Sequence, residues 1–216
     1  MKNKKLLFVI KIIILIFSIA ISSMGISLFY ALNIGTDPIS VLVDGEHNLL
    51  KMSFGNITLM NNLVLLAFGF IFARKYIKIG TVVSGLTTGY FINLFVPMFE
   101  SIIPSSTDYI YKVILLIPAV TLLALGIAVS ISLNFGVGTM DLITLSIRDR
   151  VKVELKWIKI GLDFIYTLVG FCMGGIIGLG TIIGVLLTGP LIDLFMPISG
   201  KILGNLVSTS NKEIKQ

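Results

Sequence analysis

Two aspartates lie within long apolar stretches of the sequence, Asp163 in "GLDFIYTLVGF" and Asp193 in "GPLIDLFMPI". Charged side chains at membrane depth are costly, so such residues usually face the protein interior and mark ion or substrate pathways. Asn62 and Asn93 occupy the corresponding places in an earlier part of the chain. We predict that these four side chains bind a substrate or a coupling ion. For Asp193, the alternative is contact with lipid headgroups or capping of a neighbouring helix.

Threonine–glycine pairs stand in the middle of two apolar stretches, Thr88-Gly89 and Thr188-Gly189, and Pro190 follows the second pair. Small residues let membrane helices approach closely, and a threonine can form a hydrogen bond across the contact. We expect Pro190 to break its helix and free a carbonyl group. The pairs fit a substrate site or plain helix packing, and packing is the interpretation that we favour.

Two more polar segments begin with helix-start signals, Gly35–Gly55 with "GTDP" and Gly138–Trp157 with "GTMD". Thr or Asp can cap a helix, and proline fits the first turn. Asp37 and Asp141 are therefore further candidate site residues. Each segment is apolar on one side and charged on the other, which suits a helix lying in the membrane interface. The alternative is a re-entrant half-helix whose N-terminus is available to an anion. Both remain open, and interfacial packing is the simpler.

Other kinds of site lack their residues. The chain has one cysteine, Cys172, and one histidine, His47, which excludes a disulfide framework and metal or nucleophile–base sites built on His and Cys. The glycine-rich Gly170–Gly184 contains no lysine, so we expect a tight turn and not a phosphate loop. We predict no catalytic residue, no enzyme activity, no metal and no cofactor. The net charge of +6 lies in short loops, which argues against nucleic acid as a partner.

The elements that position these residues are membrane helices. The chain of 216 residues is 56% hydrophobic and 13% charged, against roughly 25% charged in a soluble domain. Apolar stretches of about 18 residues or more are long enough to cross a bilayer. We predict an all-α, polytopic membrane protein with a single membrane domain over residues 1–216 and a cytoplasmic tail at 201–216. The six predicted spans are Leu6–Asn33, Asn56–Ala73, Thr81–Met98, Ile110–Leu133, Ile158–Gly174 and Thr181–Ile198.

The basic residues predict the orientation of these spans. All Lys and Arg residues except Lys51 and Lys112 fall at the N-terminus, in alternate links or in the tail. Basic residues are retained on the cytoplasmic side. We therefore place both termini in the cytoplasm.

The chain repeats itself. The stretches Gly80–Met98 and Gly180–Ile198 match at nine of nineteen positions, and Gly180 opens the second copy as a structural glycine. The halves, about 6–100 and 109–200, each hold three spans, so the second half must enter the membrane from the other side. Such inverted repeats place substrate sites at their interface in transporters. Two further matches extend the repeat: Asn62–Phe70 with Asp163–Phe171, and Gly35–Ser40 with Gly138–Thr144 after one insertion.

The chain resembles the YczE/YyaS/YitT family of bacterial integral membrane proteins. The stretches that carry the resemblance are "LNIGTDP" (Leu32–Pro38), "GVGTMD" (Gly136–Asp141) and "GLGTIIGVLLTGPLIDLF" (Gly178–Phe195). The first half departs from the pattern at "KYIKIGT" and at Tyr90, which stands where the second half has a proline. The resemblance implies a multi-pass protein of the bacterial cytoplasmic membrane and no agreed substrate.

The inverted repeat and the intramembrane carboxylates favour a small-molecule transporter or permease of unknown substrate. The alternative is a non-transporting accessory or regulatory protein for another membrane complex. The expected partners are the lipid bilayer, the solute and, because six short spans enclose little space, a second copy in a homodimer.

Overall fold

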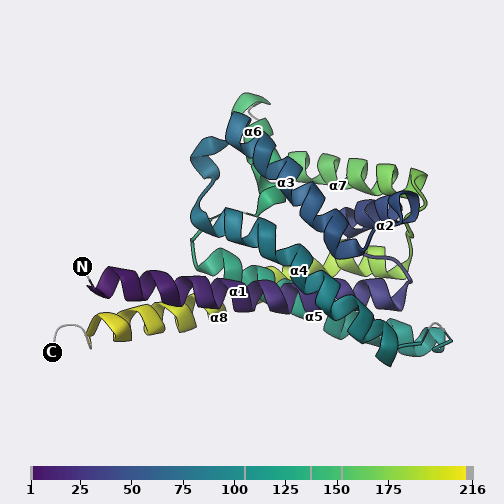
Figure 1. The fold of residues 1–216 in the computed structure, drawn as a ribbon, viewed down its shortest axis with the longest axis horizontal. Coiled ribbons are helices and arrows are strands. Elements are labelled where there is room, and N and C mark those ends of the chain that lie inside the picture. The colour runs from purple at the N-terminus through teal and green to yellow at the C-terminus, as the bar shows by residue number, and fades with distance from the viewer. Residues whose placement is uncertain (1, 105, 137, 152, 213–216) are drawn as a thin grey trace.

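The computed structural model describes residues 2–104, 106–136, 138–151 and 153–212 (Figure 1). The described residues form helices and no strand, as the sequence predicts. The elements are α1 (Lys2–Leu32), α2 (Pro38–Leu50), α3 (Phe54–Phe72), the short 3-10 helix η1 (Arg74–Tyr76), α4 (Ile79–Ile102), α5 (Tyr109–Ser132), α6 (Thr139–Val151), α7 (Leu155–Cys172) and α8 (Leu179–Lys212).

Five of these helices are long and apolar enough to cross a membrane: α1, α3, α4, α5 and α8. The remaining predicted span, Ile158–Gly174, corresponds to α7, which carries Lys156, Lys159 and Asp163. The structure therefore supports a membrane protein with several spanning helices.

Helix α8 corrects one expectation. It runs without interruption through Pro190 and Pro197, so Pro190 does not break it. A proline inside a helix removes one backbone hydrogen bond, and membrane helices tolerate this loss because neighbouring groups satisfy the freed carbonyl. The helix continues to Lys212, so the described part of the predicted tail is helical, while residues 213–216 lie outside the described part.

Helices α1 and α5 cross at the centre of the bundle through two glycines. A Cβ atom on Gly25 would lie 2.5 Å from the backbone nitrogen of Leu123, and one on Gly126 would lie 2.5 Å from the carbonyl oxygen of Ser18. Only glycine permits backbones to pack so closely. Helix α4 packs on α1, α8 packs on α5, and a buried apolar cluster that includes Phe29 lies between α1 and α5.

Helices α1, α3, α4, α5, α7 and α8 alternate in direction along the bundle, and both described chain ends lie at one end of it (Figure 1). Helix α2 lies toward the opposite end and packs against α7. Helix α6 lies toward the end with the termini and packs against α3. Helices α2, α3, α6 and α7 thus lie together on one side of the bundle.

Candidate functional site

Helix α6 begins inside the bundle and ends at its surface. The hydroxyl of Thr139, its first residue, donates to Oδ1 of Asn62 over 2.6 Å. Asn62 lies near the middle of α3 and also donates to the carbonyl of Gly85 over 3.1 Å. At the other end of α6, Asp149 accepts hydrogen bonds from Tyr76, which lies beyond the end of α3. The helix therefore runs from mid-bundle outward.

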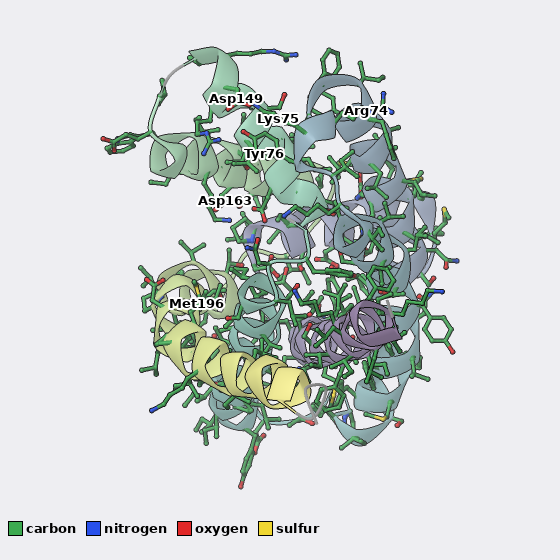
Figure 2. All side chains as sticks on the ribbon, turned by 90° about the vertical axis from the view of Figure 1, so that its left-hand side faces the viewer. Arg74, Lys75, Tyr76, Asp149, Asp163 and Met196 are labelled. Atoms are coloured by element: carbon green, nitrogen blue, oxygen red, sulfur yellow. The ribbon has the colours of Figure 1, made fainter. Side chains whose placement is uncertain are left out.

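The outer end of α6 is fixed by a charged cluster (Figure 2). Lys75 forms an ion pair with Asp149 at 2.6 Å, and Arg148 donates to the hydroxyl of Tyr76 at 2.8 Å. The Lys75 ammonium and the Tyr76 hydroxyl hold the pKa of Asp149 below its usual value. This cluster joins α6 to η1 at the end of the bundle that carries the termini.

Helix α2 has the same arrangement at the other end. The backbone of Asp37, its N-cap residue, lies against Gly184, well inside the range of α8. Near the C-terminal end of α2, the side chain of Asn48 donates to the carbonyl of Gly174 in the turn before α8, over 2.7 Å. Both segments are thus short helices that begin beside the long helices and end toward opposite ends of the bundle, and we call them half-helices.

Three carboxyl groups and one ammonium group interact electrostatically near the starts of α2 and α6. Asp163 on α7 lies within electrostatic range of Lys159, Asp37 and Asp141. Lys159 also interacts with Asp37 and Asp141. The structure therefore brings together three predicted site residues from three different helices, with Asp163 between α7 and α8 (Figure 2).

We call Asp37, Asp141 and Asp163, together with Lys159, the acidic cluster. The hydroxyl of Ser40 donates to Asp37 over 2.6 Å, and burial raises the pKa of Asp37. Asp37 is partly buried and Asp141 is exposed, so solvent reaches the cluster. Among the described residues no group of three or more His, Cys, Asp and Glu could hold a metal ion.

Lys159 was not predicted as a site residue. It stands four residues before Asp163 on α7, the spacing at which opposite charges attract on a helix. A lysine and an aspartate at this spacing inside an otherwise apolar stretch were the signal in the sequence that could have identified it.

Asn93 has a definite structural partner. Its Oδ1 accepts the backbone N–H of Gly55 over 3.0 Å, and its amide nitrogen donates to Asn56 over 2.8 Å. A Cβ atom on Gly89 would lie 2.3 Å from the carbonyl oxygen of Gly55. Asn93 and Gly89 therefore join α4 to the first turn of α3, which makes packing the role of this glycine.

Three predicted residues on α4 and α8 differ from expectation. Thr88 donates to the carbonyl of Ser84 over 2.7 Å in its own helix, not across a helix contact. The hydroxyl oxygen of Thr188 is buried and has no hydrogen-bond partner among the described residues. Asp193 is exposed, in contrast to the interior position expected for it.

The two halves of the chain form corresponding contacts at positions 101 residues apart. Gly69 on α3 packs against Leu142 of α6, and the corresponding Gly170 on α7 packs against Val41 of α2. Gly25 on α1 packs against Ala119 of α5, and the corresponding Gly126 on α5 packs against Ser18 of α1.

The loops before the half-helices correspond too, and they correct the alignment of the repeat. Asn33 and Asn134 both adopt positive φ, and Gly35 and Gly136 follow two residues later with φ of 100° and 152°. Gly35 therefore corresponds to Gly136 and not to Gly138. The match needs no insertion, because α2 and α6 are both 13 residues long.

A cavity of about 470 Å³ lies on another part of the molecule. Phe54 lies between the rings of Tyr30 and His47, each at 4.1 Å between ring centroids. Nδ1 of His47 donates to the carbonyl of Met52 over 2.6 Å, since a carbonyl can only accept. Asp44, Glu100 and Lys112 also line the cavity. No spacing in the sequence indicated that these residues would meet.

Comparison with known proteins gives a consistent picture. Residues 9–197 match the model of a family described as "Family of unknown function (DUF6198)". The chain is 26% identical over 164 residues to "Uncharacterized membrane protein YczE" of Bacillus subtilis, covering 76% of this chain and 74% of that protein. It is 28% identical over 180 residues to "Uncharacterized protein YyaS" of the same organism, covering 83% and 89%. An uncharacterized Haemophilus influenzae protein is 24% identical over 190 residues, covering 88% and 84%. No solved structure matches the chain.

Proposed function

This chain belongs to the DUF6198 family of unknown function, and we propose that it is a secondary transporter of a small cationic solute. The match confirms the resemblance to the YczE and YyaS proteins that the sequence indicated. The names of these relatives assign no activity. The proposal therefore rests on the acidic cluster near the starts of α2 and α6.

The proposed topology has six spans in two inverted halves. Helix α7 crosses the membrane in addition to α1, α3, α4, α5 and α8. The alternating helix directions and the two ends at one side of the bundle support an even number of crossings. The contacts that recur 101 residues apart support two structurally related halves. In such repeats, half-helices and broken helices form the substrate site near the bilayer midplane. With the basic η1 and the end of α6 on the cytoplasmic side, both termini are cytoplasmic.

The charges of the acidic cluster support a cationic solute. Asp37, Asp141 and Asp163 outnumber Lys159, so the cluster favours a cation. The partial positive charge at the N-terminal ends of α2 and α6 does not repel the cation. At each end a carboxyl group, Asp37 or Asp141, already offsets the helix dipole. Intramembrane carboxyl groups also serve proton relays in transporters. We therefore propose exchange of the cationic solute for protons.

The acidic cluster is the single observation that carries this proposal, and vesicle flux tests it. The purified chain is reconstituted into liposomes containing a pH-sensitive dye, and choline, putrescine or tetraethylammonium is added outside. We expect solute-dependent proton movement for at least one of the three, and roughly a tenfold loss in Asp163→Asn. The amide of asparagine does not take up and release a proton near neutral pH, so it cannot replace a carboxyl group that carries the coupled proton.

The matched control is Asp108→Asn, which removes a carboxyl group from the loop between α4 and α5 and should leave flux unchanged. Flux that is equal in both variants would exclude Asp163 from coupling. If none of the three cations moves with the protein correctly inserted, the cation assignment is wrong, and the accessory role becomes the better account of the chain.

A further inference from the structure

The two halves differ at one corresponding helix contact. Helix α4 packs closely against α3, whereas packing between α8 and α7 is marginal at most among the described residues. A Cβ atom on Gly89 would overlap the backbone of Gly55. At Gly189, the corresponding position of α8, a Cβ atom would meet nothing within 4 Å. The same is true of Gly161 on α7. The second half thus lacks a contact that the first half has.

The uncovered surface of α8 is the counterpart of the surface that α3 covers on α4. Gly85, Gly89 and Val96 are buried and Asn93 is partly buried, while every corresponding residue of α8 is exposed. We call these residues of α8 the open face: Val185, Gly189, Asp193 and Met196. Figure 2 shows Met196 and Asp163 on the two sides of the space between α8 and α7.

The contact in the first half shows what would close the second. Asn93 caps α3 by accepting the N–H of Gly55, the second residue of that helix. The corresponding residues are Asp193 and Lys156, the second residue of α7. In the structure, the N-cap residue of α7, Glu154, forms no capping hydrogen bond with its side chain. A carboxylate at a helix N-terminus is a better cap than an amide, because it also interacts with the helix dipole.

We infer that the chain has a second conformation in which α7 packs against the open face of α8 and Asp193 caps the N-terminus of α7. In that conformation the α3–α4 contact opens, since the two halves exchange roles. The inference rests on the proposed transport function and deepens it, because it supplies the alternate conformation that exposes the acidic cluster to the opposite side of the membrane. It also accounts for the polar residue that both copies of the repeat keep at this place.

Disulfide cross-linking in native membranes tests the second conformation. All variants carry Cys172→Ser. The test pair is Lys156→Cys with Gly189→Cys, the counterpart of the close pair Gly55 and Gly89. A disulfide needs Cβ atoms about 3.5–4.5 Å apart, so this pair reports the closed α7–α8 contact. Protection of both thiols from a maleimide–polyethylene glycol reagent measures the cross-linked fraction.

The control pair is Lys156→Cys with Gly200→Cys. Gly200 is also open in the structure but corresponds to Glu100, which lies beyond the α3–α4 contact. We expect cross-linking of the test pair and not of the control pair. Adding Asp193→Ala should lower the cross-linked fraction roughly fivefold, the effect of losing one N-cap, whereas Asp193→Asn should retain it. Adding Asn93→Ala, which weakens the α3–α4 contact, should raise it.

Equal cross-linking of both pairs would overturn the inference, because it would show only that α7 is mobile. A band of twice the chain mass would also overturn it, because a second copy would then cover the open face. Absence of any cross-link, with the control pair Asn56→Cys and Asn93→Cys still linking α3 to α4, would do the same. None of these readouts needs a substrate, so a failed flux assay and a failed closure are distinguished.

Discussion

The backbone N–H of Gly180 donates to the carbonyl of Ile34 over 3.0 Å, and the N–H of Gly80 donates to the carbonyl of Phe135 over 3.1 Å. Each bond joins the first turn of the last helix in one half to the loop before the half-helix of the other half. The loops pass so close to α8 and α4 because glycine stands at the contacts. These two bonds hold each half-helix against the opposite half of the chain.

Gly35→Ala is expected to destabilise the protein. Gly35 has a φ of 100°, and an added Cβ atom would lie 2.6 Å from the backbone nitrogen of Gly178. Backbone strain of this kind costs about 1–3 kcal/mol, and the steric overlap adds to it. Thermal unfolding in detergent, followed by size-exclusion chromatography, measures the loss. Gly204→Ala is the control, since its Cβ meets nothing within 4 Å. Equal melting temperatures for the two variants would contradict the tight contact.

Gly89→Ala and Gly189→Ala are expected to differ although they change the same residue of the repeat. The first places a Cβ atom 2.3 Å from the carbonyl oxygen of Gly55, and overpacking of this kind costs about 1–3 kcal/mol. The second has open space and should not lower stability. The melting temperatures of the two variants in the same detergent measure the difference. A loss at Gly189 as large as that at Gly89 would show that α8 is covered.

Asn62→Ala is expected to lose about 1–3 kcal/mol, because it leaves the buried hydroxyl of Thr139 without its acceptor. The double variant Asn62→Ala with Thr139→Ala should cost less than the sum of the two single changes. A double-mutant cycle from chemical or thermal unfolding gives the coupling. Strict additivity would mean that this bond does not hold the start of α6 to the middle of α3.

Asp37→Asn is expected to remove part of the pH dependence of stability. Burial raises the pKa of Asp37 above its ordinary value of 3.8. The folded state therefore binds more protons than the unfolded state between the two pKa values, and stability falls as pH rises from about 3.8 through the folded pKa. Asparagine can still accept the hydrogen bond from the Ser40 hydroxyl through its amide oxygen. The variant should match the wild type in acid and exceed it at neutral pH. A stability deficit at neutral pH would instead show that the carboxylate stabilises the fold.

The orientation can be measured directly with reporter fusions. A fusion after Gln216 should report the cytoplasmic side, and a fusion after Pro104, in the loop between α4 and α5, should report the outside. The reason is the placement of nearly all basic residues in the links that we assign to the cytoplasm. Two reporters on the same side would contradict the six-span topology and the inverted repeat with it.

Composition and local pattern determined much of this protein. Apolar length identified the membrane helices, and "GTDP" located the start of α2, because these signals depend on neighbouring residues alone. The two stretches that match at nine of nineteen positions also predicted two related halves. Asp37, Asp141 and Asp163 could be selected from their residue type, since charges are rare within apolar sequence.

Only the tertiary structure decided where the related residues lie. Gly89 and Gly189 stand in nearly the same sequence, yet one is buried against α3 and the other is exposed. Asn93 caps a helix while Asp193 does not, and Pro190 does not break α8. The physical reason is that a helix face is buried or open according to which distant helix packs on it. Two halves with the same local pattern can therefore adopt different packing within one chain.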